Sequence, residues 1–216
     1  MIDTNSTKCV IIKIDLTTEQ EVGRSGELAL GHANDAAYNP YNNTIAVADC
    51  SDKNGYYNTV YIIDAEKLTI KETKTVMEDT RFAPVAAITY DVNTRQYITA
   101  NQTELYFWDE NFEYVKQISA AHLPTYIEGE ETKYYANQGI DCDGTYIYRL
   151  AYYKDSQGEI TNCLIINDMN GKLIETIDLG ISVETENIVK YNDKFYVTCN
   201  NSEWNGSETY TVTFAI

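Results

Sequence analysis

Two kinds of hairpin alternate along this chain, and both are visible in its pattern of apolar and polar positions. In the first kind, an apolar strand ends at an aspartate, which is followed by a short turn and a more polar strand, as in "CVIIKIDLTTEQEV" and "VYIIDAEKLTIKET". The pattern recurs around Asp15, Asp64, Asp109 and Asp168, which are 49, 45 and 59 residues apart. Short runs rich in Tyr, Ile, Val and Thr that end at turn residues predict β-strands.

The second kind of hairpin is a strand, a turn and another strand without the aspartate mark, as in "DAAYNPYNNTIAVAD" and "AAITYDVNTRQYITAN". Its turns carry Asn, Asp, Pro or Gly, which tolerate tight or left-handed backbone. One hairpin of each kind makes a unit of about 50 residues with four antiparallel strands. Four strands that recur at such a period are the signature of a β-propeller blade. We therefore predict an all-β fold, a β-propeller of four-stranded antiparallel blades.

The hairpins also predict where the blades begin and end within a single domain, residues 1–216. The expected pieces are a partial blade at 1–24, blades at about 32–78, 83–119 and 136–179, and a closing blade at about 186–216. We favour five blades with a composite or incomplete closing blade, and four blades are the alternative. Because an unclosed edge strand promotes association, a homodimer through that edge is a further prediction.

Two segments carry a resemblance to known families. "YNPYNNTIAVAD" and "YDVNTRQYITAN" resemble the inner-to-second hairpin of YVTN-type and related propellers, which implies the same fold over nearly the whole chain. The dipeptide Trp108-Asp109 resembles the mark of WD repeats. It occurs once and without an accompanying Gly-His, so we do not interpret the chain as a WD-repeat protein.

Charge and composition restrict the partners. The chain has 33 Asp and Glu against 16 Lys and Arg, a net charge of −17 that repels phosphate backbones and argues against nucleic acid. No apolar run approaches the roughly 20 residues of a membrane span. The five cysteines are scattered without zinc-type spacing and predict buried, reduced thiols. Composition resembles secreted or surface propellers of Gram-positive bacteria, so we favour secretion or the cell surface, with any signal peptide absent from this chain.

The first strand of each blade is called the inner strand, because in a propeller it lines the central channel. The candidate site comes from the residues at the start of each expected inner strand, because these starts meet at one mouth of the channel. Three such segments, "GHANDAA", "YANQGID" and "ETENIV", carry polar pairs, whereas "RFAPVAA" is apolar. The predicted ligand-binding residues are His32, Asn34, Asp35, Asn137, Gln138, Glu186 and Asn187. In the alternative interpretation, these side chains only cap strand ends.

A metal is one ligand that such a mouth would suit. Carboxylate and amide oxygens are the ligand set that Ca²⁺ prefers, so Asp35, Asn137 and Glu186 are candidate metal ligands and calcium the candidate cofactor. The set resembles the metal site of gluconolactonase-type propellers, although those enzymes have six blades and different spacings.

Function follows from what the sequence contains and lacks. No nucleophile elbow, zincin, Walker or dinucleotide motif is present, and there are only two histidines. We favour a non-catalytic binding or scaffold propeller that recognises a ligand, glycan or protein through the channel mouth and loops. The alternative is a metal-dependent hydrolase of lactonase or glycosidase type, with Asp35 and Glu186 as the funnel carboxylates.

One long connection and six aromatic residues are further candidates for binding. The connection at 120–135 contains His122 and several acids and is expected to be a long surface loop. Six aromatic residues either stack on sugars or pack between blades, and these are Tyr56, Tyr57, Trp108, Tyr152, Tyr153 and Trp204.

Overall fold

The regular elements of this protein are all β-strands in the part of the chain that the structure describes. The computed structural model describes residues 2–5, 8–49, 58–76, 85–100, 103–120, 126–127, 130–131, 133–135, 138–154, 160–200 and 209–215. The chain divides into two compact units, Met1–Val85 and Ala86–Ile216. Within the described ranges, no helix could cross a membrane.

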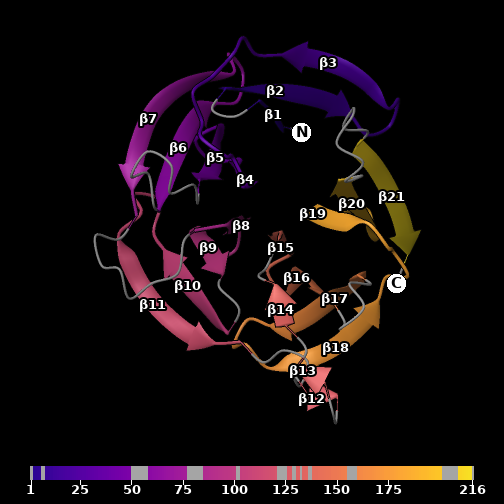
Figure 1. The fold of residues 1–216 in the computed structure, drawn as a ribbon. Helices are drawn as coiled ribbons and strands as arrows, with labels where there is room; N and C mark the ends of the chain where they lie inside the picture. Colours follow the sequence, from indigo (N-terminus) through magenta and orange to yellow (C-terminus); the bar gives the residue numbers. More distant parts are fainter. Residues whose placement is uncertain are drawn as a thin grey trace. The chain divides into compact units, whose positions relative to one another are not determined.

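Unit 1 holds two antiparallel sheets, which Figure 1 shows in indigo and purple. The first has the order β1-β2-β3, with β1 (Ile2–Asn5), β2 (Lys8–Asp15) and β3 (Gln20–Arg24). The second has the order β4-β5-β6-β7, with β4 (Asp35–Asn39), β5 (Thr44–Asp49), β6 (Thr59–Asp64) and β7 (Thr69–Thr75). Strand β1 adds to the two strands that the sequence predicts for the partial blade.

Unit 2 begins with one complete four-stranded sheet and ends with one of three strands. The first is β8 (Ala87–Asp91), β9 (Gln96–Ala100), β10 (Glu104–Trp108) and β11 (Tyr114–Ser119). The last is β19 (Glu184–Tyr191), β20 (Lys194–Asn200) and β21 (Thr209–Ala215). Both are antiparallel and follow the chain order, as expected of propeller blades.

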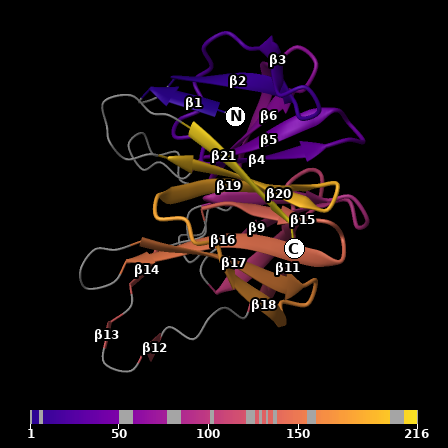
Figure 2. The same cartoon turned by 90° about the vertical axis from the view of Figure 1, so that its right-hand side faces the viewer.

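The middle sheet of unit 2 has one strand more than predicted. It comprises β14 (Lys133–Tyr135), β15 (Ile140–Cys142), β16 (Tyr146–Lys154), β17 (Ile160–Asp168) and β18 (Leu173–Asp178). Strands β14 and β15 pair with opposite ends of β16, which Figure 2 shows as a long strand. The expected loop at 120–135 also contains the short pair β12 (Tyr126–Ile127) and β13 (Glu130–Glu131). An all-β fold with four-stranded antiparallel sheets is therefore confirmed, whereas blade number and the single domain stay predictions.

The aspartates that mark the repeat each hold the hairpin between the last two strands of their own sheet, of which we call the last the outer strand. Asp15, Asp64, Asp109 and Asp168 each accept two turn amides on Oδ1, at 2.7 to 3.1 Å. Each turn then contains a residue with left-handed backbone, and the ladder shifts register just before the aspartate. The left-handed residues are Glu19, Leu68, Phe112 and Gly171. The repeat is thus a repeat of turn geometry.

A second repeated feature lies six positions before each aspartate. The backbone carbonyls of these four residues each accept an amide at 2.8 to 2.9 Å, and the residues are Cys9, Asn58, Thr103 and Asn162. The donor is the residue that directly follows the last strand of the sheet in three cases, and Leu28, four residues after β3, in the first. In three of them the side chain also contacts the linker to the next inner strand. Cys9 Sγ lies 3.5 Å from Gly31 O, Asn58 Oδ1 accepts from Val85 N at 3.1 Å, and Asn162 contacts the 181–185 segment. We call these three residues, Cys9, Asn58 and Asn162, the linker pins.

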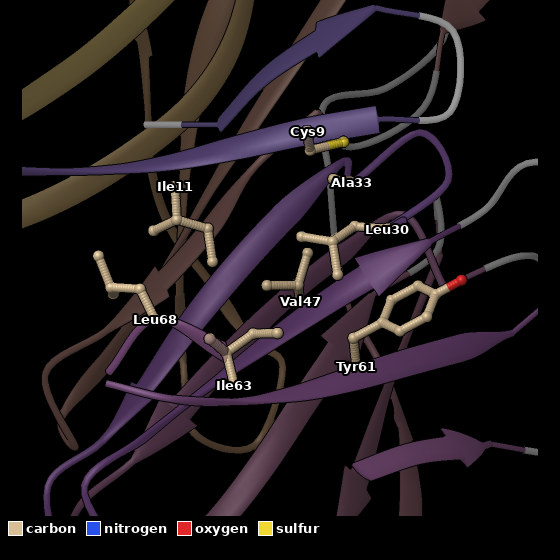
Figure 3. Packing of buried hydrophobic residues seen from close by; sticks show 8 residues of the cluster. All are labelled: Cys9, Ile11, Leu30, Ala33, Val47, Tyr61, Ile63 and Leu68. Carbon is tan, nitrogen blue, oxygen red and sulfur yellow. The ribbon is translucent and has the colours of Figure 1, made fainter. Parts of the chain in front are cut away.

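Apolar side chains fill the space between neighbouring sheets within each unit. In unit 1, Cys9 and Ile11 from β2 meet Val47 and Ile63 from the next sheet, with Leu30 between them (Figure 3). Unit 2 has two such cores, one between the β8–β11 sheet and the middle sheet, and one between the middle sheet and β19–β20. Each fully buried aliphatic side chain contributes about 1.5–3 kcal/mol, so these cores fix the inner strands in place.

Candidate functional site

The inner strands β8, β15 and β19 lie side by side in unit 2 and run in the same direction. Strand β15 contacts both of the others (Figure 1). Its first residues face the first half of β19, and its last residues face the end of β19. The three strands therefore present two sets of ends, and both sets hold polar side chains.

At the starting ends, the structure brings part of the predicted site together. Gln138 Nε2 donates to Glu184 Oε1 at 2.8 Å. The next residue, Gly139, lies so close to β19 that a Cβ there would be 2.7 Å from Asn187 Cα. Gln138 is therefore placed beside the strand that carries Glu186 and Asn187.

Glu186 occupies a distinctive position in that strand. The β19–β20 register passes from Thr185 to Asn187, so Glu186 is the extra residue of a β-bulge. Both Glu186 and Asn187 are half-buried. After burial itself, the charge of Glu186 is the second cause that raises the pKa of the Cys199 thiol. A bulge changes the direction of a side chain, and this bulge places the Glu186 carboxylate outside the regular alternation of side chains between the two faces of β19.

Between the two sets of strand ends lies the carboxylate of Asp141, which was not among the residues predicted from the sequence. Asp141 lies at the centre of β15, where Oδ2 accepts from Lys190 N at 2.7 Å and Oδ1 accepts from Thr89 Oγ1 at 3.2 Å and Cys142 N at 2.9 Å. One side chain thus joins three inner strands. Burial raises the pKa of Asp141 to about 6, although its amide and hydroxyl donors oppose this shift.

At the finishing ends, a charged cluster joins β15, β16 and β19. Lys190 Nζ donates to Asp143 Oδ2 at 2.7 Å and to the Tyr148 hydroxyl at 3.0 Å, and Tyr148 donates to the same Asp143 oxygen at 2.7 Å. Burial alone raises the pKa of Asp143, but the hydrogen bonds from Lys190, Tyr148 and two turn amides outweigh it and hold that pKa below its ordinary value.

The partners of Asp143 are held in their protonated forms. Burial, followed by the hydrogen bond to Asp143, raises the pKa of Tyr148 to about 12, even though Lys190 opposes the shift. The bonds to Asp143 and Tyr148 raise the pKa of Lys190 as well. None of the three groups is expected to change charge near neutral pH, so the cluster keeps its charges there.

The turns beyond these ends form a continuous surface, which we call the hairpin face. It consists of residues 92–95, 143–146 and 190–194. The turns touch each other, because a Cβ on Gly144 would collide with the Asn93 amide and because Lys190 reaches Asp143. Its large apolar side chains are solvent-exposed, with Val92 43%, Tyr146 37% and Tyr191 47% exposed.

In unit 1, the predicted site residues next to β4 take part in hydrogen bonds with β5 or within their own segment. His32 is exposed, and its backbone N donates to Asp49 Oδ1 at 3.0 Å. Asn34 N donates to Ala48 O at 2.9 Å, and Asp35 is buried at the first position of β4 with Oδ1 2.7 Å from Ala36 N. The turn needs left-handed backbone at Gly31, where a Cβ would lie 1.8 Å from Asp49 Oδ2. Asp49, which sequence reasoning missed, is the carboxylate that holds this turn.

The metal prediction stays a prediction. Asn137 lies outside the described residues, and Asp35 and Glu186 belong to different units. Among the described residues, no three His, Cys, Asp or Glu side chains converge as a metal site. The described cysteines are thiols, with Cys9, Cys163 and Cys199 buried and Cys142 half-buried.

Of the aromatic candidates, Trp108 packs within its own sheet. It is 2% exposed, and its Nε1 donates to Thr99 Oγ1 at 3.0 Å. The side chains of Tyr152 and Tyr153 and the residues Tyr56, Tyr57, Trp204 and His122 lie outside the described part.

No protein-family model matches this sequence, and no curated protein is a significant match. Solved structures with a similar fold include the periplasmic gluconolactonase of Pseudomonas aeruginosa, at 7% identity and a TM-score of 0.48 over 98% of this chain and 80% of that one. The WD40 domain of Pan2 from Neurospora crassa is similar at 12% identity and a TM-score of 0.49, over 98% of this chain and 61% of that one. The computationally designed Ika4 protein is similar at 12% identity and 0.42, over 85% and 90%.

Proposed function

We propose that this protein is a non-catalytic binding protein of the β-propeller type that recognises its ligand with the hairpin face. The observation that carries this proposal is the pairing of exposed tyrosines with a fixed charge cluster. Tyr146 begins β16 and Tyr191 ends β19, and both are exposed. Asp143, which accepts from Tyr146 N, forms an ion pair with Lys190, the neighbour of Tyr191. Rigid aromatic rings beside oriented polar groups are typical of recognition surfaces.

The inner-strand chemistry supports binding over catalysis. The carboxylates of Asp141 and Asp143 are engaged by backbone amides, hydroxyls and an ammonium, so each of them stabilises strand-to-strand contacts. A general acid and base need a carboxylate pair that faces an open substrate site. We assign Asp141 and Asp143 to the architecture of the face.

The fold, the class of ligand, the location and the oligomeric state of the protein complete the proposed function. We infer five blades with a composite closing blade, because five of the described sheets, with three to five strands each, follow one another along the chain and the first and last have three strands each. The ligand is a glycan or a protein, and we infer that the protein acts outside the cytoplasm. A homodimer through the edge of the closing blade belongs to the same proposal.

The test compares matched tyrosine variants on a printed array of bacterial and mammalian glycans and on a phage-displayed peptide library. Tyr146→Ser combined with Tyr191→Ser is expected to weaken binding to the selected probe at least tenfold, about 1.4 kcal/mol. The control is Tyr114→Ser, because Tyr114 is 54% exposed on the outer strand β11 and is not part of the three turns of the hairpin face. Equal loss in the control, or unchanged binding in the double variant, would overturn the proposal.

A metal-dependent hydrolase is the second candidate, which the bulged and half-buried Glu186 favours. If it holds, millimolar Ca²⁺ raises the melting temperature of the wild type but not of the Asp35→Ala and Glu186→Ala double variant. Gluconolactone hydrolysis that needs Ca²⁺ and is lost in the same variant would replace the binding proposal with this one.

A further inference from the structure

The carboxylate of Asp141 bonds to three strand segments at once. It joins Thr89 of β8, Cys142 of its own strand and Lys190 of β19. Two of these donors are backbone amides, which can only donate, whereas the Thr89 hydroxyl can also accept. The Thr89 bond is therefore the one that can reverse its direction.

The surroundings of Asp141 do not neutralise it. The described residues give it no ion pair, because the ammonium of Lys190 is directed to Asp143 and Tyr148. The titratable and charged groups on or next to β8, β15, β16 and β19 around Asp141 include Asp91, Cys142, Asp143, Tyr148, Arg149 and Lys190. Asp143 adds a like charge close by, and this charge favours the protonated carboxyl group.

We propose that Asp141 is a proton-sensitive junction between the inner strands β8, β15 and β19. When ionised, it accepts from all three donors. When protonated on Oδ1, it donates to Thr89 Oγ1 and keeps the Lys190 amide on Oδ2. The strand contacts therefore persist in both states, but the charge of this half-buried carboxylate disappears on protonation.

The direction of the pH effect follows from burial. The pKa of Asp141 is raised to about 6 in the folded protein, above the ordinary value of 3.8. A raised carboxyl pKa means that the folded state binds the proton more tightly than the unfolded state. The resulting stabilisation is complete below about pH 4 and is lost as the pH rises through about 6.

The Asp141→Asn variant tests this inference, because an asparagine amide can donate to Thr89 Oγ1 and accept from Lys190 N as the protonated acid does. Its Nδ2 cannot accept from Cys142 N, but that loss is the same at every pH and leaves the pH dependence of the two proteins comparable. Urea unfolding of both proteins is measured between pH 4 and 8. The wild-type midpoint is expected to fall relative to that of the variant between pH 4 and 7. The control Asp193→Asn, an exposed position in the β19–β20 turn, is expected to follow the wild type throughout.

A direct titration keeps the inference testable if Asp141→Asn does not fold. The carboxyl carbon resonance of Asp141 is followed by NMR in the wild-type protein. It is assigned as the aspartate carboxyl resonance that shifts most in the Thr89→Val variant. A midpoint near pH 6 that moves in Thr89→Val supports the junction. A midpoint near the ordinary value, or wild-type and Asp141→Asn unfolding curves that stay parallel with pH, would overturn it.

Discussion

Replacing the linker pin Asn162 with alanine offers a quantitative test of how the inner strands are positioned. Asn162 is fully buried in β17. Its Nδ2 donates to Ile181 O at 2.6 Å and to Val183 O at 2.7 Å, and its Oδ1 accepts from Thr185 Oγ1 at 3.0 Å. The backbone bond from Leu179 N to Asn162 O is retained in the variant. The substitution therefore removes the side-chain bonds alone.

The magnitude follows from the groups left behind. Each buried polar group that loses its partner costs about 1–3 kcal/mol. Three groups lose one, but Ile181 and Val183 are only half-buried, so water can satisfy part of the loss. We expect Asn162→Ala to lower the free energy of unfolding by about 3–4 kcal/mol. Asn162→Asp is expected to lower it further, because a carboxylate would face two carbonyl oxygens.

The assay is urea unfolding followed by far-ultraviolet circular dichroism and by tryptophan fluorescence, since Trp108 reports on unit 2. Asn170→Ala is the matched control, because Asn170 is exposed in the turn after the same strand. Asn58→Gly, which removes the bond to Val85 N without strain at a position with a φ of 61°, is expected to show a smaller loss than Asn162→Ala. A loss below about 1 kcal/mol for Asn162→Ala, or one equal to that of the control, would refute the role of the pin.

Three further predictions concern the turns. Glu19→Gly is expected to raise stability by about 0.5–1 kcal/mol in thermal melts, because Glu19 is exposed with a φ of 56° that glycine adopts without strain. Gly31→Ala is expected to destabilise unit 1 by more than about 2 kcal/mol in urea unfolding, since its Cβ would collide with the Asp49 carboxylate and its φ is positive. For Asp15, amide hydrogen bonds lower the pKa, so its stabilisation is present at neutral pH and is lost as the pH falls below the ordinary aspartate range. Asp15→Asn should therefore show a flatter acid unfolding profile than the wild type.

The fold was predictable to the extent that it depends on local turn chemistry. Asp15 and its three counterparts mark hairpins because an aspartate oxygen can hold two turn amides, and this is a property of a few consecutive residues. The extra strands β1 and β14 were not predictable in the same way. Their pairing depends on free edges of β2 and β16, which are set by tertiary contacts.

The site was predictable only in outline. The segment around Gln138 and the one around Asn187 were expected to meet, and the structure places them side by side in unit 2. Asp141 and Asp49 were missed because each lies inside a strand pattern, where a polar residue is expected to face solvent. The same expectation fails for Arg149, which is fully buried in β16 because sheets cover both faces of a second strand. Burial raises the pKa of Asp141 and lowers that of Arg149 to about 10.

The linker pins define where this architecture could be cut and joined. Each pin lies at or in one sheet, and its side chain holds the segment that leads to the next sheet, so a module that keeps these contacts is offset by half a sheet from the sheets themselves. A chimaera assembled by exchanging residues 58–102 would carry Asn58 together with the linker that it holds. One assembled at sheet boundaries would separate Asn58 from its partner at Val85 and join this pin to a foreign linker.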